Sequence, residues 1–120
     1  MVVLVVDDDP LICSVLARVF TRSGREVHTC ADAGAALAAF DSAAEPFDLL
    51  LTDVSMPGEI DGIALAGLVA RRCPEMPIVL MSGDTGSLAR GGKQAGVTAT
   101  LAKPFTLDEL GDALALASRQ

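Results

Sequence analysis

Polar residues that could do chemistry follow four short apolar runs of this 120-residue sequence. Asp7 and Asp8 come after one run, Asp53 after another, and Ser82 and Lys103 after two more. Carboxylate oxygens are ligands that Mg²⁺ prefers, and the ion typically takes one or two carboxylates together with a phosphate. A lysine ammonium is a point charge suited to a phosphoryl oxygen, and a serine hydroxyl is a hydrogen-bond donor. Brought together, these residues could support phosphoryl transfer to a carboxylate.

The apolar runs alternate with segments of helical periodicity, a pattern typical of repeated strand–helix units. The expected strands are Val2–Val6, Glu26–Cys30, Phe47–Thr52, Pro77–Met81 and Thr98–Leu101. The expected helices are Pro10–Phe20, Ala33–Phe40, Ile63–Arg72, Ser87–Ala95 and a last helix that runs to about Ala117. Strands that alternate with helices predict an α/β fold, a five-stranded parallel sheet doubly wound with helices on both faces.

Cap and breaker residues mark the ends of these helices. Asp9 can cap the first helix, and Gly24 ends it. The segment Thr106–Glu109 has the pattern of a capping box and opens the last helix. Gly91 and Gly92 lie inside the fourth helix, where each should cost about 1 kcal/mol relative to alanine. The fourth helix is therefore expected to be weak.

All of the candidate polar residues lie at the carboxyl ends of expected strands. In an open α/β sheet, ligands bind in the crevice at those ends, where the strand order reverses. If the order is 2-1-3-4-5, the first and third strands are neighbours, and Asp7, Asp8 and Asp53 converge. Two like charges about 4 Å apart repel by about 1 kcal/mol in water and about 4 kcal/mol at an effective dielectric constant of about 20. Such a cluster favours a bound cation, and its oxygen ligands favour Mg²⁺.

The composition argues against several classes of protein. Nine basic and 16 acidic residues give a net charge of −7, which disfavours direct binding to nucleic acid or anionic lipid. No apolar run approaches the roughly 20 residues that span a bilayer, so we expect no membrane insertion. The three cysteines have no zinc-ligand spacing, which indicates buried free thiols in a reducing cytoplasm. We expect one cytoplasmic domain over residues 1–120, with no output domain.

Four stretches of the sequence resemble the receiver domain of two-component response regulators. They are Val-Val-Asp7-Asp8-Asp9, Leu-Leu-Leu-Thr-Asp53-Val-Ser-Met-Pro57, Val-Leu-Met-Ser82-Gly83 and Lys103-Pro104-Phe105. Each stretch alone is a weak signal, but all four in this order and at these intervals are highly specific. The resemblance covers essentially the whole chain, and it implies a flavodoxin-like (βα)5 fold with strand order 2-1-3-4-5.

The resemblance also implies roles for the acidic residues. Asp53 would be the phosphoacceptor. Asp8 and Asp53 would bind Mg²⁺ through their side chains, and Ser55 would bind it through its backbone carbonyl. Asp7 would help to hold the ion through water. The domain would thus supply the metal site for its own phosphorylation.

Further roles and partners follow from the same resemblance. Lys103 would contact the phosphoryl group beside a cis Lys103–Pro104 peptide bond, and Ser82 would bind a phosphoryl oxygen and draw its loop inward. A sensor histidine kinase or a histidine phosphotransfer protein would donate the phosphoryl group, with Leu11, Val15 and Pro104 as contacts. The phosphorylated form would bind a downstream protein target through the fourth helix, fifth strand and fifth helix, with no direct contact to nucleic acid.

The sequence departs from the family pattern at two places. Thr100 stands where receivers usually carry an aromatic residue on the fifth strand, so the Ser82 loop and the fourth helix are expected to carry the signal without a ring rotation. The loop over residues 56–62 is one residue longer than the common form. Ser55 and Asp84 are expected to flank the acyl phosphate and to tune its hydrolysis.

Two other interpretations stay open at this point. Asp7-x-Asp9 after a strand is similar to the nucleophile motif of haloacid-dehalogenase-like phosphatases, but Pro10 replaces their usual small β-branched residue. A pseudo-receiver that only binds protein would not need Asp53 and Lys103, which are both present. We therefore expect a phosphoacceptor that assists its own phosphorylation and dephosphorylation, and not a turnover enzyme. The composition, rich in alanine and with more arginine than lysine, suggests a bacterial source.

Overall fold

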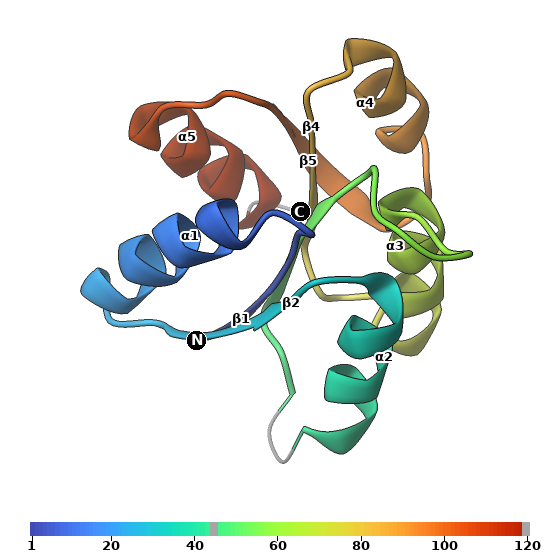
Figure 1. The fold of residues 1–120 in the computed structure, drawn as a ribbon, viewed down its shortest axis with the longest axis horizontal. Helices are drawn as coiled ribbons and strands as arrows, with labels where there is room; N and C mark the ends of the chain where they lie inside the picture. Colours follow the sequence, from blue (N-terminus) through green and yellow to red (C-terminus); the bar gives the residue numbers. More distant parts are fainter. Residues whose placement is uncertain (44–45, 119–120) are drawn as a thin grey trace.

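The computed structural model describes residues 1–43 and 46–118; residues 44–45 and 119–120 of the predicted domain lie outside the described residues. Five parallel strands form one sheet in the order β2-β1-β3-β4-β5 (Figure 1). The strands are β1 (Val2–Val6), β2 (Glu26–Cys30), β3 (Leu49–Asp53), β4 (Ile78–Ser82) and β5 (Val97–Ala102). The helices are α1 (Pro10–Arg22), α2 (Ala33–Ser42), α3 (Gly62–Arg72), α4 (Thr85–Gly91) and α5 (Leu107–Ser118). This arrangement confirms the predicted doubly wound α/β fold and its strand order.

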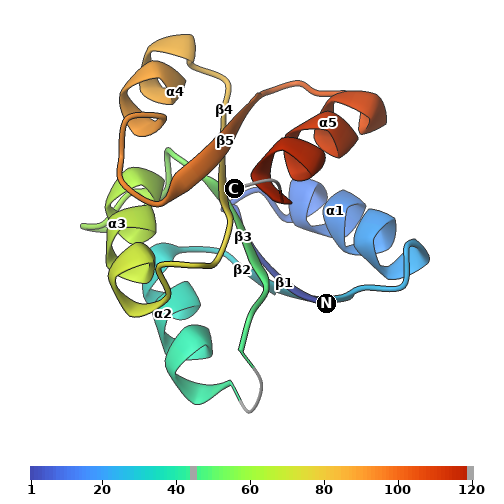
Figure 2. The same ribbon diagram turned by 180° about the vertical axis from the view of Figure 1, so that it is seen from behind.

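Helices cover both faces of the sheet. α1 and α5 lie on one face, and α2, α3 and α4 lie on the other (Figures 1 and 2). Because side chains alternate along a strand, β1 sends Val3 and Val5 into the core under α1 and α5, and Leu4 and Val6 into the core on the opposite side. The central strands β3 and β4 are buried throughout, which explains why their sequences read as nearly continuous apolar runs.

Local hydrogen bonds explain where two helices begin. The Leu11 N–H donates to Asp9 Oδ1 at 2.9 Å, so Asp9 caps α1 as predicted. The predicted capping box forms at the start of α5, where the Thr106 N–H donates to Glu109 Oε1 at 3.0 Å and the Glu109 N–H donates to Thr106 Oγ1 at 3.1 Å. Gly24 follows α1 with φ of 83°, a backbone conformation that favours glycine.

Most boundaries differ from the predicted ones by one or two residues. α1 and α2 each run two residues further than predicted. β3 begins at Leu49 and not at Phe47, and both β3 and β4 extend one residue further, so that they include Asp53 and Ser82. These two polar residues are therefore held by the sheet itself and not by the loops that follow it.

The largest error in the prediction concerns the fourth helix. α4 spans Thr85–Gly91, whereas the prediction was Ser87–Ala95. The helix begins earlier because the Asp84 carboxylate accepts a hydrogen bond from the Gly86 N–H at 2.9 Å and caps it. A Cβ atom on Gly91 would lie 2.3 Å from Leu80 Cδ1, so glycine at this position lets α4 approach β4 closely.

The cysteines and the single histidine take no part in a metal-binding cluster among the described residues. Cys13, Cys30 and Cys73 are free thiols, as predicted, but each is partly exposed and not buried. His28 lies on the edge strand β2, with its ring centroid 5.5 Å from that of Phe47 in an edge-on contact. No helix in the described part of the chain combines the length and the apolar character needed to cross a membrane.

Candidate functional site

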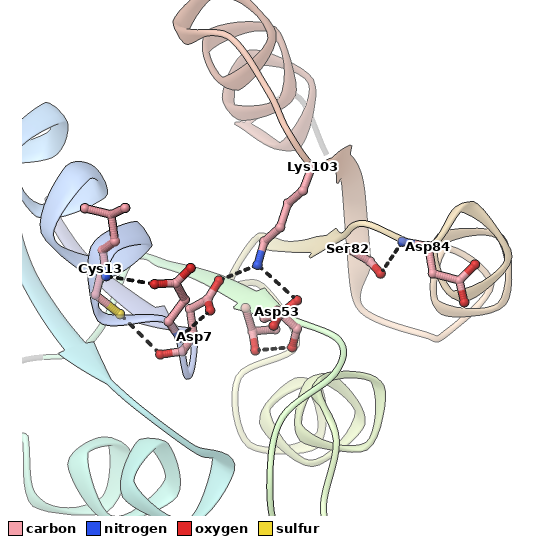
Figure 3. A network of polar contacts seen from close by, with 9 residues as sticks. Asp7, Cys13, Asp53, Ser82, Asp84 and Lys103 are labelled. Atoms are coloured by element: carbon pink, nitrogen blue, oxygen red, sulfur yellow. Dashed lines mark hydrogen bonds and ion pairs between the residues drawn. The ribbon is translucent and has the colours of Figure 1, made fainter.

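The carboxyl ends of four strands bring the predicted site residues to one edge of the sheet (Figure 3). Asp7 directly follows β1, Asp53 and Ser82 are the last residues of β3 and β4, and Lys103 directly follows β5. Because these strands are parallel neighbours, their carboxyl ends meet at the same edge. The sheet therefore assembles a site from residues that are far apart in the sequence.

Three carboxylates form the acidic centre of this site. One oxygen from each of Asp7, Asp8 and Asp53 lies within 4.8 Å of the other two. Asp7 is only 1% exposed and Asp53 7% exposed, whereas Asp8 is exposed. A cluster of hard oxygen ligands with one open side fits Mg²⁺, which binds few carboxylates and keeps several waters.

The Lys103 ammonium lies between two of the carboxylates. Its Nζ is 2.6 Å from Asp7 Oδ2 and 3.3 Å from Asp53 Oδ1 (Figure 3). Burial alone lowers the pKa of Lys103, but the hydrogen bond to Asp7 and the negative charges of both carboxylates outweigh burial and raise that pKa above its ordinary value. Lys103 is therefore a fixed positive charge beside Asp53. The Lys103–Pro104 peptide bond is cis, as expected.

Asp53 is in an environment that makes its ionised form costly. Burial raises the pKa of its carboxyl above the ordinary value, and the charges of Asp7 and Asp8 add to this effect, while Lys103 opposes it. The raised pKa means that the carboxylate is more basic than an exposed aspartate. A cation or a bond to an electrophile at this oxygen would relieve the unfavourable charge.

Gly62 is a site residue whose importance the sequence did not reveal. The Gly62 N–H donates to the Val54 carbonyl oxygen at 2.8 Å, which brings the start of α3 against the backbone that follows Asp53. A Cβ atom on Gly62 would lie 1.9 Å from the Asp53 carbonyl oxygen. Only glycine permits this approach. The available sequence signal was Asp61, which caps α3 by accepting from the Ala64 N–H at 2.8 Å.

Asp7 is also held by neighbours that the sequence did not implicate. The Asp9 N–H donates to Asp7 Oδ1 at 2.9 Å. The Cys13 thiol donates to the Asp7 carbonyl oxygen at 3.3 Å from the first turns of α1. Cys13 thus packs against the site, a contact that its sequence position alone does not indicate.

The Ser82 hydroxyl forms a hydrogen bond with the residue that caps α4. Its oxygen accepts a hydrogen bond from the Asp84 N–H at 3.0 Å (Figure 3), and its backbone carbonyl accepts from the Lys103 N–H at 2.9 Å. The Asp84 carboxylate is occupied with the cap of α4, where it accepts from the Gly86 N–H and from the Ser87 hydroxyl. The expectation that Asp84 tunes hydrolysis of an acyl phosphate stays a prediction.

Two other predicted residues lie around the site. Ser55 is exposed and lies two positions after the end of β3. The predicted use of its backbone carbonyl as a ligand stays a prediction. Thr100 lies on β5 and is exposed, and its Cγ2 would be 3.5 Å from a Cβ atom built on Gly92, which follows α4.

Comparison with known proteins shows the family to which the chain belongs. Residues 3–115 match the family described as response regulator receiver domain. The chain is 35% identical over 119 residues to the transcriptional regulatory protein TcrA of Mycobacterium tuberculosis, covering 98% of this chain and 46% of TcrA. The chain thus spans less than half the length of this relative.

Two solved structures of response regulators have the same fold. One is the chemotaxis response regulator CheY4 of Vibrio cholerae, with 31% sequence identity, a TM-score of 0.84 and coverage of 97% of both chains. The other is TrrA of Thermotoga maritima in complex with Mg(2+)-BeF, with 27% identity, a TM-score of 0.85 and coverage of 97% of both chains.

The sheet order and the cluster of aspartates with a lysine at the strand ends define a receiver-type signalling domain. The chain belongs to the response regulator receiver domain family. It is homologous to two-component response regulators, so the resemblance stated from the sequence is confirmed, and neither the phosphatase nor the pseudo-receiver interpretation is favoured.

Proposed function

We propose that this domain accepts a phosphoryl group on Asp53 from a phosphohistidine of a partner protein. An oxygen of the Asp53 carboxylate attacks the phosphorus, the phosphorus–nitrogen bond breaks, and the imidazole nitrogen leaves with the electron pair. The observation that carries this proposal is the position of Asp53, which is buried, lies beside two further carboxylates and is 3.3 Å from the Lys103 ammonium. The raised pKa of Asp53 supports its role as a nucleophile.

Asp7, Asp8 and Asp53 would hold Mg²⁺, with the Ser55 carbonyl as a further ligand. The bound ion would neutralise the charge that gathers on the phosphoryl oxygens. The acidic cluster supports this assignment because its three oxygens lie within 4.8 Å of one another. A related response regulator with 27% identity has been solved in complex with Mg(2+)-BeF, which is consistent with the same use of the corresponding site.

Lys103 and Ser82 would bind the phosphoryl group once it is on Asp53. Lys103 is charged and lies 3.3 Å from Asp53 Oδ1, so its ammonium can bind an oxygen of a phosphoryl group attached to that carboxylate. Ser82 is 3% exposed and lies on the strand next to Asp53. Its hydroxyl would move from Asp84 to a phosphoryl oxygen, which draws the loop before α4 toward the site.

The phosphodonor is a sensor histidine kinase or a histidine phosphotransfer protein. We propose that it docks on α1, because this helix borders the site and exposes two apolar side chains, Leu11 at 69% and Val15 at 47%. Pro10 and Ser14 of the same helix line a cleft of about 420 Å³ together with Asp8. Exposed apolar groups beside a polar crevice are typical of a protein-binding surface.

The domain acts in the cytoplasm as a signalling module and not as a turnover enzyme. We propose that residues 1–120 form one receiver domain whose phosphorylated state binds a downstream protein target. The net charge of −7 supports a protein target over direct contact with nucleic acid. Any wider activity of a protein that contains this domain depends on segments that lie outside the chain described here.

Intact-protein mass spectrometry tests this function. The chain is incubated with Mg²⁺ and acetyl phosphate, and Asp53→Asn is treated in parallel. We expect one added phosphoryl group on the wild type alone, with loss of the addition when EDTA removes Mg²⁺. A phosphoryl group on Asp53→Asn as well would place the acceptor elsewhere. Catalytic turnover of a phosphate ester would instead support the phosphatase interpretation.

A further inference from the structure

Ser82 is connected to helix α4 by a short series of polar contacts, of which the proposed function involves only the one between Ser82 and Asp84. The Asp84 N–H donates to Ser82 Oγ at 3.0 Å. The Ser87 hydroxyl donates to Asp84 Oδ2 at 3.0 Å, and the Arg90 guanidinium donates to Ser87 Oγ at 3.2 Å. We refer to Ser82, Asp84, Ser87 and Arg90 as the α4 latch.

The latch holds Asp84 through both its side chain and its backbone. The Ser87 hydroxyl and the Gly86 N–H keep the pKa of Asp84 below its ordinary value, so its carboxylate is a charged and stable acceptor. Ser87 is only 5% exposed, and water therefore competes little for its hydroxyl. With the carboxylate held in this way, the Asp84 N–H is directed at Ser82, and the Ser82 hydroxyl is held toward α4.

We propose that Ser87 is a positioning residue that acts through Asp84 to oppose the movement of Ser82 toward a phosphoryl group on Asp53. This proposal rests on the proposed function. The Asp84 N–H fixes the position of the Ser82 oxygen, and a contact that is lost when Ser82 moves favours the unphosphorylated arrangement. Loss of the latch also removes support from α4, which spans only seven residues. Phosphorylation of Asp53 thereby changes the surface of α4.

The variant Ser87→Ala tests the latch because it removes one hydroxyl and leaves the charge of the site unchanged. The probe is beryllofluoride with saturating Mg²⁺, a stable mimic of a phosphoryl group on aspartate, titrated into the full chain and followed by amide NMR signals. We expect Ser87→Ala to bind beryllofluoride about fivefold more tightly than the wild type, the factor that corresponds to one hydrogen bond of about 1 kcal/mol. Its affinity for Mg²⁺ alone should be unchanged.

Ser23→Ala is the matched control. The Ser23 hydroxyl also links an arginine to a helix end, since it accepts from Arg25 at 2.9 Å and donates to the Phe20 carbonyl at 2.9 Å. Ser23 precedes β2 and so lies near the amino ends of the strands, whereas the site lies at their carboxyl ends. Both variants should lose a little stability, but only Ser87→Ala should gain affinity, which a merely structural role would not produce.

The outcomes separate the latch from the function on which it rests. Equal or weaker beryllofluoride binding by Ser87→Ala, with normal binding by the wild type, overturns the latch alone. The same gain in Ser23→Ala also overturns it, because the effect would then be a general result of lower stability. If the wild type binds no beryllofluoride while Mg²⁺ is bound, the proposed function fails and the latch fails with it.

Discussion

Lys103 Nζ lies 2.6 Å from Asp7 Oδ2, although 96 positions separate these residues in the sequence. The same ammonium is 3.3 Å from Asp53 Oδ1, so it bridges two carboxylates that would otherwise repel each other in a poorly hydrated crevice. The side chain of Asp7 has no exposed surface, and that of Lys103 is 20% exposed. The lysine thus compensates part of the negative charge of the site before any metal ion binds.

Removing this ammonium should destabilise the free domain. Lys103→Met keeps the length of the side chain and leaves Asp7 and Asp53 without their cation. We expect the free energy of unfolding without Mg²⁺ to fall by about 2 kcal/mol, the scale of a hydrogen bond to a charged group. Urea unfolding in EDTA measures this change. Lys93→Met, which alters the only other lysine at an exposed position, should stay within about 0.5 kcal/mol of the wild type.

The charge of Asp53 should make the stability of the free domain depend on pH. Folding raises the pKa of this carboxyl above its ordinary 3.8, so the folded chain holds the proton more tightly than the unfolded chain. Stability from this group therefore falls as pH rises from about 4 through the raised pKa. Asn does not titrate, so Asp53→Asn does not lose this stability. Its free energy of unfolding should match that of the wild type at low pH and should increasingly exceed it as the pH rises through that interval.

Thermal unfolding of both proteins in EDTA from pH 3.5 to 7 measures this difference. We expect Asp53→Asn to melt at a higher temperature than the wild type at pH 7, and this difference should disappear at low pH. Asp112→Asn is the control, because Asp112 is exposed on α5. A wild type that is more stable than Asp53→Asn at pH 7 would contradict the prediction.

Mg²⁺ should stabilise the wild type through the three carboxylates. Binding to the folded state at 100 times the dissociation constant contributes about 2.7 kcal/mol, and EDTA should reverse it. Asp8→Asn should lose most of this effect because Asp8 supplies one of the clustered oxygens. Circular dichroism melts with and without Mg²⁺ check the prediction.

Asp9→Ser is the control for this experiment. It removes a neighbouring negative charge but keeps a residue that caps α1 well. Its response to Mg²⁺ should resemble that of the wild type. An equal loss of the response in both variants would show that general acidity, and not the cluster, attracts the ion.

Gly62→Ala should disturb the site through the backbone of Asp53. The new Cβ would lie 1.9 Å from the Asp53 carbonyl oxygen, so the Asp53 backbone or the start of α3 must shift. We expect a loss of about 2 kcal/mol in the free energy of unfolding and slower phosphorylation by acetyl phosphate. A mass-spectrometric time course measures the phosphorylation rates of the wild type and of Gly62→Ala, and urea unfolding measures their stability.

The matched control for Gly62→Ala is Gly111→Ala in α5. A Cβ atom at Gly111 would meet no atom within 4 Å apart from the adjacent residues and the nearby backbone of α5 itself. Replacing glycine by alanine inside a helix should then stabilise the domain by about 0.5–1 kcal/mol, with no effect on phosphorylation. Opposite signs for the two variants would show that the contact with Asp53, and not glycine itself, is what matters.

Much of the fold could be predicted because its signals are local. The apolar run Val2–Val6 and the segment Glu26–Cys30 both form strands with the predicted ends. The caps at Asp9 and in Thr106–Glu109 also form as expected, because each involves residues only two or three positions apart. Signals of this kind need no knowledge of distant contacts.

The errors have both local and distant causes. The start of α4 was predicted too late because the cap formed by Asp84, a local signal, was not recognised. The close approach of Gly91 to Leu80 of β4 is a distant contact that the sequence does not show. In the same way, Gly62 read as an ordinary residue at the start of a helix, whereas its contact with Asp53 depends on how α3 returns to the sheet. The α4 latch was not anticipated from the sequence, although its contacts join residues only two or three positions apart.

The sequence by itself determined the alternation of strands and helices, the residues at the strand ends and, through four family motifs, the kind of domain. The tertiary structure alone decided the pairing of Lys103 with Asp7 and Asp53 and the approach of Gly62 to Asp53. The reason is physical: residue types and local periodicity are written along the chain, but distances between side chains depend on strand order, register and close packing of elements far apart in sequence.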